Sequence, residues 1–151
     1  MAVATINNEN LCRLLFYHRM VSEDGALGKE AFPTNELIEA QGKSVSVDVM
    51  SSLSVPEHIY NKLVTYENPK AGRSKWGYAF ANSAEIESVL SQCGKQVFKC
   101  TPDPLTSFPP APWDHAHAKI TRASEDMGKG FVRGYRDKLR QLFQQNAIRS
   151  P

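Results

Sequence analysis

The stretch KSVSVDVMS, residues 43–51, carries the clearest strand pattern of the chain and sets the expected fold class. Branched aliphatic side chains alternate in it with small polar ones: Val45, Val47 and Val49 against Ser44, Ser46 and Asp48. Because successive side chains of a strand point to opposite faces, one face is expected to be apolar and the other polar. The polar face either meets water or lines a pocket, so Ser46 and Asp48 are candidate ligand-binding residues.

Elements on either side of this strand complete the expected architecture. Residues 11–20 form either a buried strand or the end of a short helix, since so short an apolar run shows no decisive period. Further strands are predicted at 76–81, 95–100 and 115–122, and helices at 54–68, 83–93 and 131–143. Because these elements do not follow a regular βαβ order, we predict one α+β domain over residues 1–151. Its sheet is expected to be mostly antiparallel, with four to six strands flanked by two or three helices.

Capping residues and prolines mark where these elements end. Ser83 is the expected N-cap of the predicted helix 83–93, and Gly94 is expected just past its C-terminus. Residues 101–112 contain five of the nine prolines, at 102, 104, 109, 110 and 112, and are predicted to be an extended crossover. Residues 1–9 and 147–151 are expected to be frayed.

The composition is that of an ordinary globular protein, with 41% hydrophobic and 23% charged residues, which argues against disordered and fibrous classes. No apolar run approaches the roughly 20 residues that cross a bilayer, and the N-terminus lacks the pattern of a signal peptide. We therefore expect a cytoplasmic protein with no membrane partner. Three cysteines without tight spacing argue against a disulfide framework, and Cys93 and Cys100 are expected to be buried thiols.

The motif WDHAHAKI, residues 113–120, places His115 and His117 on one face of a predicted strand. These two residues are the candidate catalytic side chains, as general acid or base or as metal ligands once a third ligand is supplied. Alternatively they are two half-exposed histidines with no chemical role. No H-E-x-x-H motif or paired C-x-x-C motif supports a metal site, and no glycine-rich loop of the form G-x-x-x-x-G-K occurs, so no metal and no cofactor are predicted.

The chain resembles small bacterial proteins that share a Ser-Val-Ser-Val strand, here residues 44–47, and a late Pro-x-x-His-Ala-His strand, here residues 112–117. The resemblance covers roughly residues 11–120. It implies no activity, because no function is established for those proteins.

The end of the chain is basic: residues 119–151 hold eight Lys or Arg and three acidic residues, whereas the whole chain has a net charge of +2. The predicted C-terminal helix is amphipathic and carries a basic stripe: Lys129, Arg133, Arg136 and Arg140. This stripe either faces water, meets a protein partner or a second copy of the chain, or contacts nucleic acid. Nucleic acid is the less favoured choice, because the isoelectric point near 8.4 is modest for a nucleic-acid-binding domain and no binding motif occurs.

Two functional hypotheses follow from these features. The first is a binding or accessory protein with a polar pocket on the sheet and a basic interaction helix. The second is a small enzyme acting on a nucleotide or phosphoester, with His115 or His117 as acid, base or metal ligand and with Arg13 or Arg19 binding the anion. The first is preferred because no complete catalytic constellation is present in the sequence.

Overall fold

The computed structural model describes residues 6–17, 19–32, 45–52, 57–71, 74–103, 116–123 and 134–149. These residues form one open six-stranded sheet in the order β4-β5-β2-β1-β3-β6, and every neighbouring pair is antiparallel. The strands are β1 (Asn10–Tyr17), β2 (Val45–Val49), β3 (Ser74–Asn82), β4 (Phe98–Pro102), β5 (His117–Arg122) and β6 (Ala147–Arg149). The helices are α2 (Glu57–Tyr66), α3 (Ser83–Glu87) and α5 (Arg136–Gln144), with 3₁₀ turns η1 (Lys29–Ala31), η3 (Met50–Ser52) and η4 (Pro69–Ala71). The predicted α+β class with a mostly antiparallel sheet is confirmed.

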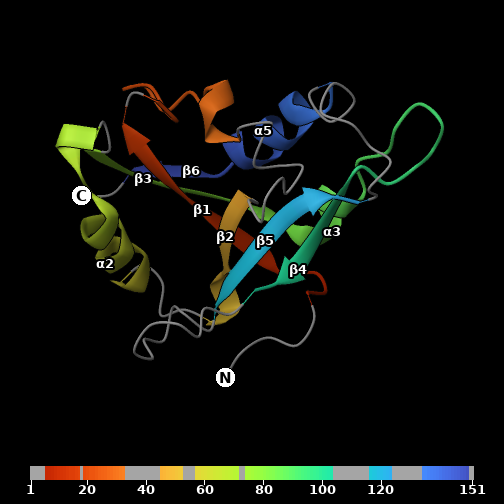
Figure 1. Ribbon diagram of the computed structural model, residues 1–151, viewed down its shortest axis with the longest axis horizontal. Helices are drawn as coiled ribbons and strands as arrows, with labels where there is room; N and C mark the ends of the chain where they lie inside the picture. The colour runs from red at the N-terminus through yellow and green to blue at the C-terminus, as the bar shows by residue number, and fades with distance from the viewer. Residues whose placement is uncertain are drawn as a thin grey trace.

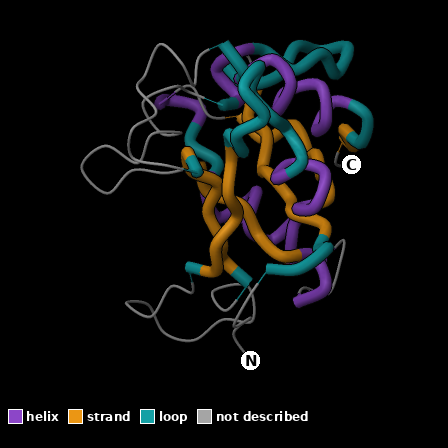
Figure 2. Tube along the Cα trace, turned by 90° about the vertical axis from the view of Figure 1, so that its right-hand side faces the viewer, coloured by secondary structure: helices purple, strands orange, loops and turns teal. Residues whose placement is uncertain are grey.

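The sheet separates two apolar clusters, one on each side. Figure 1 shows the helices α2 and α5 well apart, with β1 and β3 between them. Val45, Val47 and Val49 belong to the larger cluster, which also contains Leu139 and Phe143 of α5. The smaller cluster lies on the opposite side, where α2 packs on β1 and β3: Cys12, Phe16, Ile59, Leu63 and Tyr78. The strands also bend and twist, as expected for an antiparallel sheet (Figure 2).

The run at residues 11–20, left open between strand and helix, forms the long strand β1, which lies inside the sheet between β2 and β3. A register shift between Leu15 and Phe16 interrupts its pairing with β3. Leu11 and Leu15 are buried in the larger cluster, and Cys12 and Phe16 are buried in the smaller one. Because both faces of β1 are covered, the segment is apolar without a simple alternation.

The helix predicted after residue 82 is shorter than expected, and its predicted caps are wrong. Asn82 is the N-cap and accepts a hydrogen bond from the Ala84 N–H, whereas Ser83 is buried and accepts from the Glu9 N–H. The helix ends at Glu87, and Gly94 lies with φ of 79° in a turn whose flanking residues pair as an isolated antiparallel bridge. The local apolar spacing therefore predicted too long a helix, because the residues after Glu87 form a bridged turn instead.

Two further expectations differ from the structure. Residues 147–149, expected to be frayed, form β6 on the edge of the sheet beside β3. Cys93, expected in the core with Cys100, is exposed, whereas Cys12 and Cys100 are buried. In the predicted crossover, Thr101 and Pro102 belong to β4, and residues 104–112 lie outside the described part of the chain.

Candidate functional site

The structure brings Asp48, Ser46 and His117 together on adjacent strands. Asp48 lies opposite His117 in the β2–β5 pairing, and Ser46 lies opposite Lys119. Directly opposed residues of antiparallel strands project to the same face, with Cβ atoms about 4.5–5.5 Å apart. These side chains therefore share the face that β2 turns away from the larger apolar cluster.

The same face continues onto β4, where Thr101 lies opposite Lys119 and Lys99 lies opposite Thr121. We call this side of the three strands the polar face. It consists of Ser46, Lys99, Thr101, His117, Lys119 and Thr121, of which Thr121 is buried. The sequence alone does not indicate Lys99, Thr101, Lys119 or Thr121 as site residues. They come together only because three strands that are distant in the chain pair with one another. The alternation of polar residues in KITR would have indicated two of them once the register was known.

His117 is held in a fixed orientation by the end of β4. Its Nδ1 lies 2.8 Å from the Asp103 carbonyl oxygen and 3.3 Å from the Asp103 carboxylate, and its side chain is 11% exposed. A hydrogen bond to a carbonyl oxygen requires a proton on Nδ1, so the neutral ring carries its lone pair on Nε2. Among the described residues Nε2 has no partner.

Asp48 forms a buried ion pair with Lys62 of α2. The Lys62 ammonium lies 2.7 Å from each Asp48 carboxylate oxygen, and both side chains are 5% exposed. Cys12 lies opposite Asp48 on β1, and burial raises the pKa of its thiol, with the Asp48 charge adding to the rise and Lys62 opposing it. Asp48 thus joins α2 to the sheet, and the polar face begins beside it.

Arg13 does not reach the polar face. Its position next to Cys12 places it on the opposite side of the sheet, where its Nε donates to the Ala31 carbonyl and its Nη1 to the Ser46 carbonyl. The guanidinium also lies over the Phe32 ring, 5.9 Å from its centroid. Arg19 is exposed in the turn after β1, outside the β2–β5 pairing that brings Asp48 to His117.

The remaining predicted site residues lie either outside the described part of the chain or on α5. His115, Lys129 and Arg133 lie outside the described residues. Arg136 and Arg140 lie on α5, where Arg140 donates to the Asp137 carboxylate and reaches the Leu27 carbonyl oxygen at 3.5 Å. The apolar side of this helix is covered, since Leu139 and Phe143 are completely buried against the sheet. Any contact of α5 with a partner would therefore use its polar outer side.

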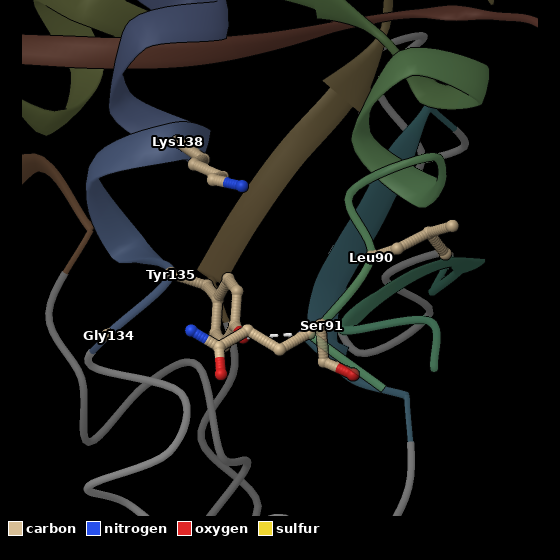
Figure 3. A pocket seen from close by; sticks show the side chains of 6 residues that line it. Leu90, Ser91, Gly134, Tyr135 and Lys138 are labelled. Carbon is tan, nitrogen blue, oxygen red and sulfur yellow. Dashed lines mark hydrogen bonds between the residues drawn. The ribbon is translucent and has the colours of Figure 1, made fainter. Parts of the chain in front are cut away.

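A cavity of about 520 Å³ lies away from the polar face, between the turn that follows α3 and the start of α5. It is lined by Leu90, Ser91, Gln92, Gly134, Tyr135 and Lys138 (Figure 3). None of the predicted site residues that the structure describes belongs to it. Sequence reasoning missed it because residues 88–93 were predicted to continue the helix, whereas residues 90–92 belong to the turn that lines the cavity.

Neither a metal-binding cluster nor a membrane-crossing helix occurs within the described ranges. No group of three His, Cys, Asp or Glu side chains there is placed to hold a metal ion. No described helix combines the length and the apolar character that a membrane crossing requires. Comparison with protein-family models, with curated proteins and with solved structures finds no match to this chain.

Proposed function

We propose that this protein is a cytoplasmic, ligand-binding or accessory protein that holds a small polar ligand on the polar face. The observation that carries the proposal is the orientation of His117. Asp103 engages Nδ1, which leaves Nε2 as the nitrogen for a ligand. A ring whose tautomer is set by a second residue is typical of histidines that bind or react through the other nitrogen.

The residues around His117 favour a ligand with anionic or hydrogen-bonding groups. Ser46 is exposed, and its hydroxyl can donate or accept. Lys119 lies directly opposite Ser46, and Lys99 projects from β4 on the same face. Among the described residues beside His117, the Asp48 carboxylate is paired with Lys62 and the Asp103 carboxylate lies against the His117 ring, so lysines and hydroxyl groups define the remaining chemistry.

The second candidate function is an enzyme acting on a nucleotide or phosphoester with His117 as general acid or base. One observation favours it: the Asp103 carboxylate lies 3.3 Å from the same Nδ1 whose hydrogen bond orients the ring. A carboxylate in that place stabilises the imidazolium that forms when Nε2 takes a proton. The lysines of the polar face would then bind the phosphate group.

The test is a two-dimensional NMR titration of the full chain with adenosine 5′-monophosphate and, separately, with inorganic phosphate. We expect saturable shifts of the amides of Ser46, His117 and Lys119, and their loss in the His117→Ala variant. Lys70→Gln, which removes an exposed lysine from η4, is the control and should titrate like the wild type.

The outcomes separate the two candidates. Binding without turnover supports the binding protein, and hydrolysis of p-nitrophenyl phosphate that disappears with His117→Ala supports the enzyme. Shifts that scatter over the surface, or shifts unchanged in His117→Ala, would contradict both. The His115→Ala/His117→Ala double variant should stay folded, and its unfolding would assign the pair to the core.

A further inference from the structure

The cavity beside α5 is bounded by two elements that are each fixed in place. On one side, Ser91 and Lys95 close the turn, because the Ser91 N–H donates to the Lys95 carbonyl and the Ser91 hydroxyl accepts from the Lys95 N–H. On the other side, α5 is anchored in the core by Leu139 and Phe143. The volume of about 520 Å³ falls within the range of pockets that hold small molecules.

Tyr135 joins the two walls. Its hydroxyl oxygen accepts a hydrogen bond of 3.2 Å from the Gln92 N–H, which ties the residue before α5 to the turn (Figure 3). The aromatic ring therefore has a set position at the cavity, and the cavity does not depend on a mobile aromatic side chain. A surface with a fixed ring is suited to contact with an apolar group.

Among the lining residues that the structure describes, Lys138 carries the single formal charge. Its Nζ lies 5.6 Å from the centroid of the Tyr135 ring, and the side chain extends from α5 toward the turn (Figure 3). Among the six lining residues none is acidic, and Asp137, the neighbour of Lys138, accepts a hydrogen bond from Arg140. The ammonium of Lys138 is therefore the group that would select a ligand of opposite charge.

Leu90 supplies the apolar part of the lining. Its side chain is 50% exposed, although the neighbouring Val89 is partly buried and Ser91 is buried. Covering an exposed leucine side chain with an apolar group contributes about 25 cal/mol per Å² of apolar surface removed from water. A ligand that combines an anion with a compact apolar body would use both Lys138 and Leu90.

We propose that this cavity is a second binding site, separate from the polar face, for a small organic carboxylate with a compact apolar body. The carboxylate lies on Lys138 Nζ, and the apolar body lies against Leu90 and Tyr135. A single cation matches a monoanion. The site is independent of the proposed function, because α5 packs on the side of the sheet opposite the polar face.

The experiment is an NMR titration of the full chain with 3-phenylpropionate and with 3-phenylpropan-1-ol, which has the same apolar body and no charge. We expect the carboxylate to shift the amides of Gln92, Gly134 and Lys138 saturably, and the alcohol to bind about tenfold more weakly. Lys138→Gln should lower the affinity for the carboxylate to that of the alcohol, and Lys138→Arg should retain it. Leu90→Ala should weaken both ligands, and Lys70→Gln should weaken neither.

Equal affinity for the two molecules would overturn the proposal, since Lys138 would then have no part in selection. Saturable shifts at other residues, or no saturation at millimolar ligand, would overturn it as well. Because the Lys138 side chain is exposed, its variants are expected to fold, so a loss of binding reports on the site.

Discussion

Lys62 is almost completely buried, and its ammonium group contacts both oxygens of Asp48. Removing two charges from water is costly, and their mutual attraction offsets this cost only when the contact is close. The pair stabilises the position of α2 on the sheet, since the two residues belong to different elements. Nothing in the local sequence around residue 62 indicates this role.

The two charges should therefore be tightly coupled. Asp48→Ala or Lys62→Ala alone leaves one buried charge without its partner and is expected to lower the free energy of unfolding by about 3–5 kcal/mol. The Asp48→Leu/Lys62→Met double variant, which replaces the pair by apolar side chains, should recover most of that loss. Urea unfolding followed by circular dichroism measures all three. A double variant no more stable than the single ones would mean that the pair is not coupled in this way.

The three cysteines should differ in reactivity. Burial raises the pKa of the Cys100 thiol to about 12, and the Glu87 charge adds to the rise, while burial also raises the pKa of Cys12. Since the thiolate is the reactive form, iodoacetamide at pH 8 should modify Cys93 alone in the native protein and all three after unfolding. Mass spectrometry of tryptic peptides identifies the modified residues. Labelling of Cys100 at the rate of Cys93 would show that β4 opens readily.

The raised pKa of Cys100 also has a consequence for stability. Below the ordinary thiol pKa of 9.0, the thiol is protonated in the folded and in the unfolded chain. Between 9.0 and about 12 the unfolded chain alone loses the proton, so stability is expected to fall as the pH rises through this range.

At the scale of elements, β6 depends on a glycine in its neighbour β3. A Cβ atom on Gly77 would lie 2.0 Å from the Ile148 carbonyl oxygen and 2.8 Å from the Arg149 Cα. Such distances are far inside van der Waals contact, so only a residue without a side chain lets β6 approach.

Gly77→Ala is therefore expected to displace β6 while the rest of the sheet persists. The amide hydrogens of Tyr78 and Ile148, which face each other in the β3–β6 pairing, should lose protection from hydrogen exchange. Gly28→Ala is the matched control, because the nearest atom to its Cβ would be 3.7 Å away. Unchanged protection at Ile148 in Gly77→Ala would show that the backbone adjusts without releasing the strand.

These elements also show where sequence reasoning succeeds and where it stops. The strand at Val45–Val49 was predictable because its two faces meet different surroundings and its side chains alternate accordingly. The strand β6 has three residues, too few to show a period, and its stability comes from the distant Gly77. The helix α3 was overextended because residues 88–93 keep a helical spacing although the chain turns there. Of the polar face, Ser46 and His117 were predicted from the alternation within their own strands. Lys119 and Thr101 were not, because their place on this face depends on the register between distant strands.

At the scale of the whole molecule, the sheet has two edge strands, β4 and β6. The outward backbone groups of β4 are covered by hydrogen bonds from side chains. The outward Cys100 N–H donates to the Glu87 carboxylate, and the outward Phe98 carbonyl oxygen accepts from the Gln96 side chain. Pro102, the last residue of the strand, has no N–H to offer. Side chains thus occupy backbone groups that another strand could otherwise pair with.

Removing this protection should increase self-association. The Glu87→Ala/Gln96→Ala double variant leaves the Cys100 N–H and the Phe98 carbonyl oxygen open at the edge, and pairing between β4 strands of two molecules becomes favourable. Sedimentation velocity over a range of concentrations compares the variant with the wild type. Glu85→Ala, in the same helix but exposed, is the control. A variant that sediments like the wild type at every concentration would show that Glu87 and Gln96 do not guard the edge.

The strand order has a further consequence for how fast the chain folds. The first strand lies inside the sheet, Val47 pairs with Ala118, and Tyr78 pairs with Ile148, so most neighbours in the sheet are far apart along the chain. Long loops must close before these pairs can form, and two-state domains with such distant contacts fold on a scale of about milliseconds to seconds. Stopped-flow refolding is therefore expected to be slow for a chain of this length.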